Sequence, residues 1–222
     1  MENVIKVLEE RGFIDRMTHS EIEREVSKPI KVYAGFDPTS DSLHLGNLVG
    51  IMGLAWMQKY GHTPIAVLGG ATGLIGDPSG KSKERNLLDE ITLKRNIRSL
   101  EKFFHRILSS QEGPKPIILN NYDWLGKFNF VDFLRDVGKQ YRVGPMMGKE
   151  MVRNRLQSEE GISFTEFTYQ ILQGYDFHYL SKEHGVTLQI GGSDQWGNIT
   201  SGIEYNRKVG GVPLYGVTFP FT

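Results

Sequence analysis

The chain has 222 residues, of which 39% are hydrophobic and 11% aromatic, so it can bury a core and is not a disordered polypeptide. Its 26 basic and 26 acidic residues give a formal net charge of zero, so a nucleic-acid partner would have to be held by local basic patches. The absence of cysteine excludes disulfides, thiolate zinc sites and a thiol nucleophile. The sequence contains no signal-peptide core and no apolar run long enough to cross a bilayer, which predicts a soluble, cytoplasmic protein without a membrane partner.

The first predicted elements are a helix, a strand and a second helix. Charged and apolar residues alternate over Met1–Glu10 and predict an amphipathic helix, within an N-terminal helical segment of residues 1–28. The β-branched and aromatic run Ile30–Phe36 predicts a strand. The mostly apolar run Gly46–Tyr60 predicts a helix that ends at Gly61.

Strands and helices continue to alternate along the rest of the chain. Pro64–Leu68 predicts a second, buried strand, and apolar residues at helical spacing predict a helix over Ile91–Leu108. Ile117–Leu119 and Thr187–Ile190 predict two further strands. Asp194–Lys208 predicts a final helix.

This alternation predicts an α/β fold, namely a Rossmann-like, doubly wound parallel sheet over residues 29–222 with helices on both faces. Helical segments between the third and fourth predicted strands indicate a helical insertion, at about residues 125–160 and centred on Asn129–Gln157. In open parallel sheets, ligands bind outside the carboxyl ends of the strands. We therefore expect the functional residues in the segments that follow the strands.

The first such segment is Pro38–Asn47, between a predicted strand and an apolar helix. His44 and Asn47 are three residues apart at the start of the helix, so both can point toward one ligand. Gly46 leaves room for a flat ring, and the helix N-terminus suits a phosphate. A surface turn with Ser and Asp caps is an equally valid interpretation of this segment alone.

The second segment is the glycine-rich run Gly69–Ser82. It is not a Walker A loop, because Ile75 stands where that motif requires glycine, and it contains no G-x-G-x-x-G. What remains is a flexible loop after a strand, with Asp77 near the sheet and Lys81 and Arg85 beyond it. It could be a plain connection, but structureless loops of this length usually have a function.

The third segment is the helix that follows Ile162, which starts with a predicted capping box of Ser163 and Glu166. Tyr169, Gln173 and Asp176 follow at helical spacing and share one face. A phenol, an amide and a carboxylate beside apolar residues suit a small polar ligand with an aromatic body. The alternative is an ordinary face exposed to solvent.

The fourth segment is Leu188–Trp196, where a predicted strand ends at Gly191-Gly192 and a helix starts at Asp194. A close backbone approach beside a carboxylate suits the two hydroxyls of a ribose. No metal site is predicted, because H-E-x-x-H is absent and the histidines outside the first segment are scattered: His19, His62, His105, His178 and His184.

Taken together and in this order, the segments resemble the catalytic domain of bacterial-type tyrosyl-tRNA synthetases, which are class I aminoacyl-tRNA synthetases. The resemblance covers nearly the whole chain. Seven stretches carry it: Tyr33–Thr39, the turn from His44 to Asn47, Gly76–Gly80, Asn121–Trp124, Phe164–Tyr169, Gln173–Asp176 and Gly191–Asn198.

The resemblance implies a ligase that activates L-tyrosine with ATP to tyrosyl-adenylate and transfers it to tRNA(Tyr). ATP would be a substrate that brings Mg²⁺, with no dedicated protein metal site and no organic cofactor. The residues implied for tyrosine are Tyr33, Asp77, Tyr169, Gln173, Asp176 and Gln195. Those implied for ATP are Asp37, Gly46, Gly192 and Asp194, with His44, Asn47 and Thr39 in catalysis and Lys81 and Arg85 at pyrophosphate or tRNA.

The chain departs from the family pattern in two ways. The usual His-x-Gly-His signature ends here on Asn47, which still donates hydrogen bonds but carries no charge. The Lys-x-x-Lys-Ser/Thr loop and the anticodon-reading parts of the family do not occur before Thr222. We therefore expect a fragment that binds tyrosine but is catalytically impaired.

Further expectations concern assembly and the alternative functions. The resemblance implies a homodimer, with Asn129–Met151 as the expected interface. A tryptophanyl-type enzyme of the same class is one alternative, although a Tyr33–Asp176 pair is better suited to a phenol than to an indole N–H. The other is a non-catalytic module of the same fold that binds tyrosine or RNA.

Overall fold

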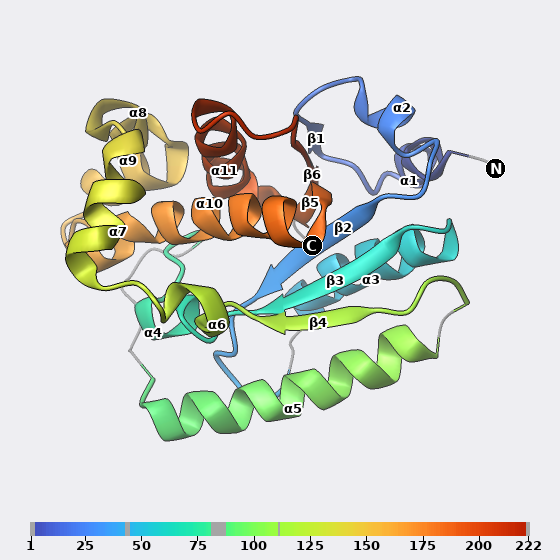
Figure 1. Ribbon diagram of the computed structural model, residues 1–222, viewed down its shortest axis with the longest axis horizontal. Helices are drawn as coiled ribbons and strands as arrows, with labels where there is room; N and C mark the ends of the chain where they lie inside the picture. Colours follow the sequence, from blue (N-terminus) through green and yellow to red (C-terminus); the bar gives the residue numbers. More distant parts are fainter. Residues whose placement is uncertain (1–2, 43–44, 81–87, 111, 221–222) are drawn as a thin grey trace.

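A computed structural model describes residues 3–42, 45–80, 88–110 and 112–220 of the chain. These residues form one six-stranded sheet with helices on both faces (Figure 1). The strand order is β1-β6-β5-β2-β3-β4, and the strands are β1 (Arg16–Met17), β2 (Lys31–Phe36), β3 (Thr63–Leu68), β4 (Ile117–Asn120), β5 (Val186–Gly192) and β6 (Tyr215–Phe219).

The predicted doubly wound α/β fold is confirmed, with one correction to the sheet. Strands β6, β5, β2, β3 and β4 pair in parallel, but β1 pairs antiparallel with β6, so the sheet is mixed. Strand β1 lies in residues 1–28, which were expected to be only helical. Its two residues carry no periodic signal, and the distant strand β6 holds it through pairs such as Arg16 with Thr218.

The helices α3, α5 and α11 agree with the predicted ones to within one or two residues, whereas α1 begins at Val4, three residues after the predicted start at Met1. Gly61 has a φ of 86° just after α3, in the left-handed region that favours glycine, and so ends that helix as expected. The helices are α1 (Val4–Glu10), α2 (Ile22–Glu25), α3 (Leu45–Lys59), α4 (Thr72–Ile75), α5 (Glu90–Ser109), α6 (Tyr122–Leu125), α7 (Phe130–Asp136), α8 (Val143–Gly148), α9 (Glu150–Leu156), α10 (Phe164–His184) and α11 (Trp196–Lys208), with 3-10 turns η1 (Gly138–Gln140) and η2 (Ser193–Gln195).

Two predicted segments differ in detail from the structure. The loop that starts at Gly69 contains the one-turn helix α4, so its first part is not structureless. The helix expected from Asp194 begins as the 3-10 turn η2 and becomes α-helical at Trp196. Both differences are local and leave the order of elements unchanged.

The alternating side chains of the sheet divide the interior into two cores. On one face, Val32, Ala34 and Phe36 of β2 pack with α1, α3 and α5. On the other face, Tyr33 packs with Phe177 of α10, and α6 and α11 cover the same side. Figure 1 shows α5 below the sheet and α10 above it. Tyr33 therefore faces α10 because of the period-two alternation of the strand.

The helical insertion consists of α7, η1, α8 and α9 and packs against α10 and α11. A buried ion pair joins α9 to α10, since Arg155 donates two hydrogen bonds of 2.9 and 2.8 Å to the carboxylate of Glu166. The serine half of the predicted capping box is confirmed, because Ser163 Oγ accepts from the backbone N–H of Glu166. Glu166 thus belongs to the contact that fixes the insertion to the first turn of α10.

Candidate functional site

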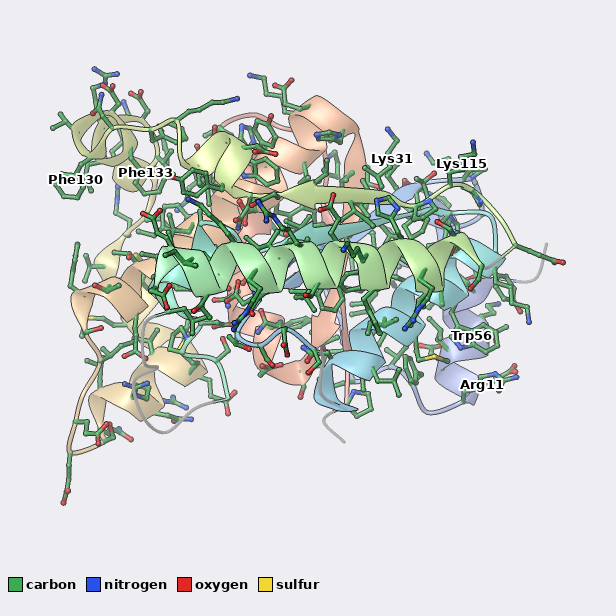
Figure 2. The ribbon with its side chains drawn as sticks, turned by 90° about the horizontal axis from the view of Figure 1, so that it is seen from below. Arg11, Lys31, Trp56, Lys115, Phe130 and Phe133 are labelled. Carbon is green, nitrogen blue, oxygen red and sulfur yellow. The ribbon has the colours of Figure 1, made fainter. Side chains whose placement is uncertain are left out.

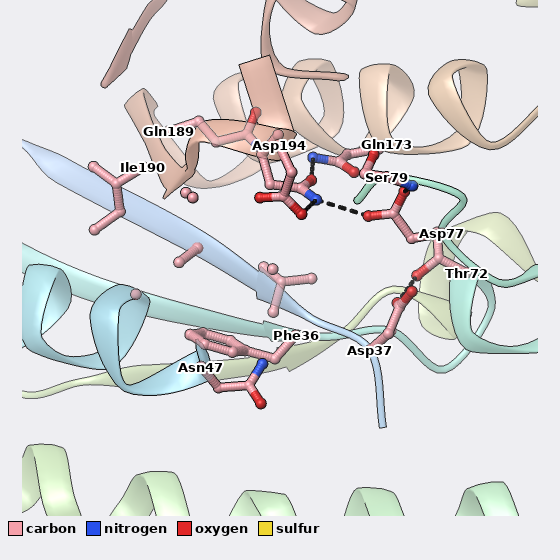
Figure 3. A pocket seen from close by; sticks show the side chains of 18 of the residues that line it. Phe36, Asp37, Asn47, Thr72, Asp77, Ser79, Gln173, Gln189, Ile190 and Asp194 are labelled. Carbon is pink, nitrogen blue, oxygen red and sulfur yellow. Dashed lines mark hydrogen bonds between the residues drawn. The ribbon is translucent and has the colours of Figure 1, made fainter. Parts of the chain in front are cut away.

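A cavity of about 260 Å³ lies at the carboxyl ends of the central parallel strands (Figure 3). Strand β2 pairs with β3 on one side and with β5 on the other, so the strand order of the sheet reverses between β2 and β5. This is the position where open α/β sheets bind ligands. The cavity is lined by twelve residues singled out from the sequence: Tyr33, Asp37, Thr39, Gly46, Asn47, Asp77, Tyr169, Gln173, Asp176, Gly192, Asp194 and Gln195.

Three residues singled out from the sequence lie outside the described residues: His44, Lys81 and Arg85. Their expected roles stay predictions.

The structure shows that the face of α10 with Tyr169, Gln173 and Asp176 is buried, because all three side chains lie against the cavity. The alternative of a solvent-exposed face is wrong.

Tyr33 is an almost fully buried residue of the cavity wall. Its side chain is 1% exposed and its ring packs edge-on against Phe177. Its hydroxyl oxygen is buried and has no hydrogen-bond partner among the described residues. Burial, together with the nearby charge of Asp176, raises the pKa of Tyr33 well above its ordinary value. A buried hydroxyl without a partner is unfavourable, so this site is suited to a ligand that supplies one.

Asp176 stands beside Tyr33 and is held rigidly. Trp124 Nε1 donates to one carboxylate oxygen at 2.7 Å, and Asn121 Nδ2 donates to the other at 2.9 Å. The pKa of Asp176 is raised to about 7, mainly by burial and in addition by the charge of Asp37, against the opposing effect of these two hydrogen bonds. Each carboxylate oxygen can still accept a further hydrogen bond, so Asp176 can accept from a ligand in addition to Trp124 and Asn121.

The raised pKa makes the stability of the fold depend on pH. Between the unfolded value of 3.8 and the folded value of about 7, the folded chain holds a proton on Asp176 that the unfolded chain has lost. The bound proton therefore stabilises the folded state fully below about pH 4. This stabilisation, about 4 kcal/mol at most, is lost as the pH rises to about 7. Asp176→Asn cannot titrate, so we expect its free energy of unfolding relative to wild type to rise between pH 5 and pH 8. Urea denaturation at both pH values checks this, and an unchanged difference contradicts it.

A chain of hydrogen bonds joins Asp176 to the middle of the cavity. Asn121 Nδ2 also donates to Thr72 Oγ1 at 2.9 Å, and Thr72 donates to Asp37 at 2.8 Å. Tyr169 donates its hydroxyl proton to the other oxygen of Asp37 at 2.8 Å. Burial raises the pKa of Tyr169 well above its ordinary value, so it remains a neutral phenol whose oxygen can accept a hydrogen bond.

A second polar group forms the opposite wall, around Gln195. Its Nε2 donates to Asp77 at 2.7 Å and to Asp194 at 3.3 Å, while its Oε1 accepts from Gln173 at 3.1 Å. The backbone N–H of Ser79 donates to Asp77 at 2.9 Å. These contacts bring together residues from the loop after β3, from α10 and from η2.

The third wall is formed by the first turn of α3. Gly46 and Asn47 line the cavity there, and Figure 3 shows Asn47 projecting from this helix near Phe36. Gly192 ends β5 across the opening and Thr39 follows β2. The partial positive charge of a helix N-terminus beside this wall suits the phosphates of a nucleotide.

The sequence did not reveal the residues that support these walls. Asn121 joins three segments, because it also accepts a hydrogen bond from the backbone N–H of Ala71. Asn198 donates to Ser79 at 3.2 Å, and buried Gln189 lines the cavity from β5. Asn121 and Asn198 fall inside stretches that carried the family resemblance, which was the only signal pointing to them.

Among the described residues, no three His, Asp or Glu side chains gather in a way that could hold a metal ion. No helix among them combines the length and apolar character that a membrane crossing needs.

The comparisons with known proteins identify the family. The model of the "tRNA synthetases class I (W and Y)" matches residues 25–222. The chain belongs to this family. The match takes in all the strands from β2 to β6 and every described residue that lines the cavity.

Named relatives of this synthetase family confirm the resemblance to tyrosyl-tRNA synthetases. The tyrosine–tRNA ligase of Protochlamydia amoebophila is 60% identical over 221 residues, which are 99% of this chain and 52% of that protein. The chloroplastic and mitochondrial tyrosine–tRNA ligase of Arabidopsis thaliana is 51% identical over 98% of the chain and 44% of its own length. The chain thus spans about half the length of the curated relatives it matches.

A solved structure of the same family has the same fold. It is the C-terminally truncated mitochondrial tyrosyl-tRNA synthetase of Aspergillus nidulans, with a TM-score of 0.86 and 32% identity. The superposition covers 100% of this chain and 70% of that structure. The arrangement of the strands around the cavity is therefore that of a class I synthetase.

Proposed function

We propose that this chain forms the tyrosine- and ATP-binding part of a tyrosine–tRNA ligase, which makes tyrosyl-adenylate and transfers the tyrosyl group to tRNA(Tyr). The observation that carries the proposal is the buried hydroxyl of Tyr33, which has no hydrogen-bond partner among the described residues and lies beside Asp176. A phenol can donate to Asp176 and accept from Tyr33 at the same time. Both buried polar groups are then satisfied by one ligand atom.

The polar end of tyrosine would meet the middle of the cavity. Its ammonium group needs a carboxylate and neutral acceptors, which Asp77, Tyr169 and Gln173 supply within the same cavity. Tyr169 suits this role because its proton is already donated to Asp37, so its oxygen presents lone pairs. Gln195 would lie near the carboxylate of the substrate, within reach of ATP.

ATP would occupy the side of the cavity formed by α3 and the end of β5, and it would bring Mg²⁺ as part of the substrate. Asp37, Gly46, Gly192 and Asp194 are the proposed contacts, and Asp194 suits the ribose hydroxyls. The pKa of Asp194 is raised by burial and by the charge of Asp77, so a hydrogen-bonding hydroxyl pair is a favourable neighbour.

The first reaction is a displacement at the α-phosphorus of ATP. An oxygen of the tyrosine carboxylate forms the new bond, the bond to the β-phosphate oxygen breaks, and pyrophosphate leaves with the electron pair. No proton transfer is required, because the carboxylate is already ionised. Catalysis then rests on positioning and on hydrogen-bond donors toward the phosphate, for which we propose Thr39, Asn47 and His44, with Lys81 and Arg85 toward pyrophosphate or tRNA.

Two alternatives differ from this proposal, one in its ligand and the other in its activity. In a tryptophan-activating enzyme, the substrate has no hydroxyl to accept from Tyr33, and its indole N–H could satisfy only Asp176. A non-catalytic module would bind tyrosine or RNA without tyrosine-dependent exchange of pyrophosphate with ATP. The relatives named as tyrosine–tRNA ligases favour the first proposal over both.

Calorimetric titration of the chain with tyrosine, phenylalanine and tryptophan tests the proposal. We expect tyrosine to bind and phenylalanine to bind at least about a hundredfold more weakly, because phenylalanine leaves two buried polar groups unpaired. Tryptophan should bind no better than phenylalanine. Equal binding of tyrosine and phenylalanine, or no binding of either, contradicts the proposal.

We also propose a homodimer that acts in the cytoplasm, with the interface on α7 and α8 within Asn129–Met151. Phe130 and Val131 of α7 are 69% and 68% exposed, and Val143 of α8 is 61% exposed. Figure 2 shows Phe130 at one end of the molecule. Exposed apolar side chains concentrated in this way favour a protein interface. Sedimentation velocity checks the assembly, and a monomer at micromolar concentration contradicts it.

A further inference from the structure

The outer face of α5 carries a row of positive charge that the proposed site does not use. This helix has five basic residues and two acidic ones, so it holds a net charge of three, whereas the whole chain is neutral. Its buried face consists of Leu93, Asn96, Leu100, Phe104 and Leu108. Figure 2 shows α5 crossing the front of the molecule, with no helix over its outer face in that view.

The basic residues are spaced regularly along the helix. Lys94, Arg98, Lys102 and Arg106 follow one another every four residues, and all four are exposed. Four residues of α-helix rise by about 6 Å, so the row is about 18 Å long. A shallow depression on the helix surface is lined by Lys94, Arg98 and Lys102 together with Ile91, Arg95 and Ser99.

Most of this charge is not neutralised by neighbouring side chains. Lys94 forms an ion pair of 3.2 Å with Glu90, an exposed pair of the kind that contributes little. Within the described ranges of the chain, Arg98, Lys102 and Arg106 have no carboxylate within ion-pair distance. Glu101 is the other acidic residue of the helix. The row is therefore available to a partner with regularly spaced negative charges.

The start of α5 is attached to the wall of the cavity. Asn96 Nδ2 donates to the backbone carbonyl of Pro38 at 2.9 Å, and Pro38 directly follows the cavity residue Asp37. Leu93 lies so close to Gly73 that a Cβ atom there would stand 3.0 Å from it. The row of charge thus begins beside the loop that carries Asp37 and Thr39, and runs away from it.

We infer that the α5 row, Lys94, Arg98, Lys102 and Arg106, binds the sugar–phosphate backbone of the RNA substrate while the RNA end reaches the cavity. The inference rests on the proposed function for the identity of the RNA. A nucleic-acid strand presents phosphates at regular intervals, and lysine and arginine bind them by charge and, for arginine, by paired hydrogen bonds. Such contacts position the RNA without reading its sequence.

The test measures binding of the chain to a fluorescent RNA hairpin with a single-stranded 3′ end, by anisotropy at several salt concentrations. We expect R98E/K102E to bind at least about tenfold more weakly and to lose about two units of salt slope. The matched control is K28E/K182E, which makes the same charge change at two exposed lysines outside α5. The control should change the affinity by less than about threefold.

Three results would overturn the inference: no RNA binding by the wild-type chain, equal weakening in both double variants, or displacement of the RNA by polyglutamate of equal charge. The last would indicate an acidic protein as the partner. Tyrosine titration of the same variants separates this inference from the proposed function. Loss of RNA binding with normal tyrosine binding supports the row, whereas absence of tyrosine binding in the wild type contradicts the proposed function alone.

Discussion

Replacing Asp176 by Ala should lower the affinity for tyrosine at least about a hundredfold, because the hydrogen bond between the substrate hydroxyl and a buried carboxyl group is lost and the hydroxyl is left without that partner. The affinity for phenylalanine should change far less, since phenylalanine has no hydroxyl to place there. The preference for tyrosine over phenylalanine should therefore fall below about tenfold. Calorimetric titration of the variant with both amino acids measures the two affinities directly.

The matched control for this variant is Asp123→Asn. Asp123 is an exposed carboxylate of α6, close in sequence to the Asp176 partners Asn121 and Trp124. Its removal should leave both affinities unchanged. Asp176→Asn is a second variant that keeps the side-chain shape if the alanine variant folds poorly. A preserved preference for tyrosine in Asp176→Asn and Asp176→Ala alike would show that the phenol lies elsewhere.

Replacing Glu166 by Gln should lower the free energy of unfolding by about 3–5 kcal/mol, because it leaves Arg155 buried without a counter-charge. The two side chains are only 4% and 2% exposed. Arg155 also donates from Nε to the carbonyl oxygen of Gly161 at 3.1 Å, so it cannot easily move into solvent. Urea denaturation at fixed protein concentration measures the loss.

An exposed ion pair of the insertion provides the control. Arg135 and Asp132 of α7 are 3.1 Å apart with side chains 64% and 41% exposed. Asp132→Asn should cost less than about 1 kcal/mol. The double variant R155M/E166L should recover most of the stability lost in Glu166→Gln, since both charges are removed together. A loss in Glu166→Gln no larger than that in Asp132→Asn would mean that the buried pair does not hold the insertion to α10.

These two variants act on neighbouring parts of one helix. Glu166 lies in the first turn of α10, and Asp176 lies almost three turns further along the same helix. The ion pair connects the insertion to the helix that carries three of the proposed tyrosine contacts. We therefore expect Glu166→Gln to lower the affinity for tyrosine as well, by less than Asp176→Ala does, in addition to its effect on stability.

The sequence by itself determined the order and the type of the main elements. Strand β2 and helices α3 and α5 were predicted to within one or two residues, because β-branched runs, helical spacing and a terminal glycine act over short distances. It also pointed to twelve residues that line one cavity, through stretches characteristic of a family. Local patterns sufficed here because each stretch follows a strand, and the carboxyl ends of parallel strands meet at one edge.

Only the tertiary structure decided which polar faces are buried. The spacing of Tyr169, Gln173 and Asp176 fits a solvent-exposed face as well as a pocket, because periodicity says which residues share a face and not what covers it. Likewise, β1 is held by β6 across about 200 residues of chain, and Asn121 has its role through partners on α4 and α10. Such contacts join segments far apart in sequence, so no local pattern could reveal them. The partnerless hydroxyl of Tyr33, on which the proposed function rests, became visible only when these segments were brought together.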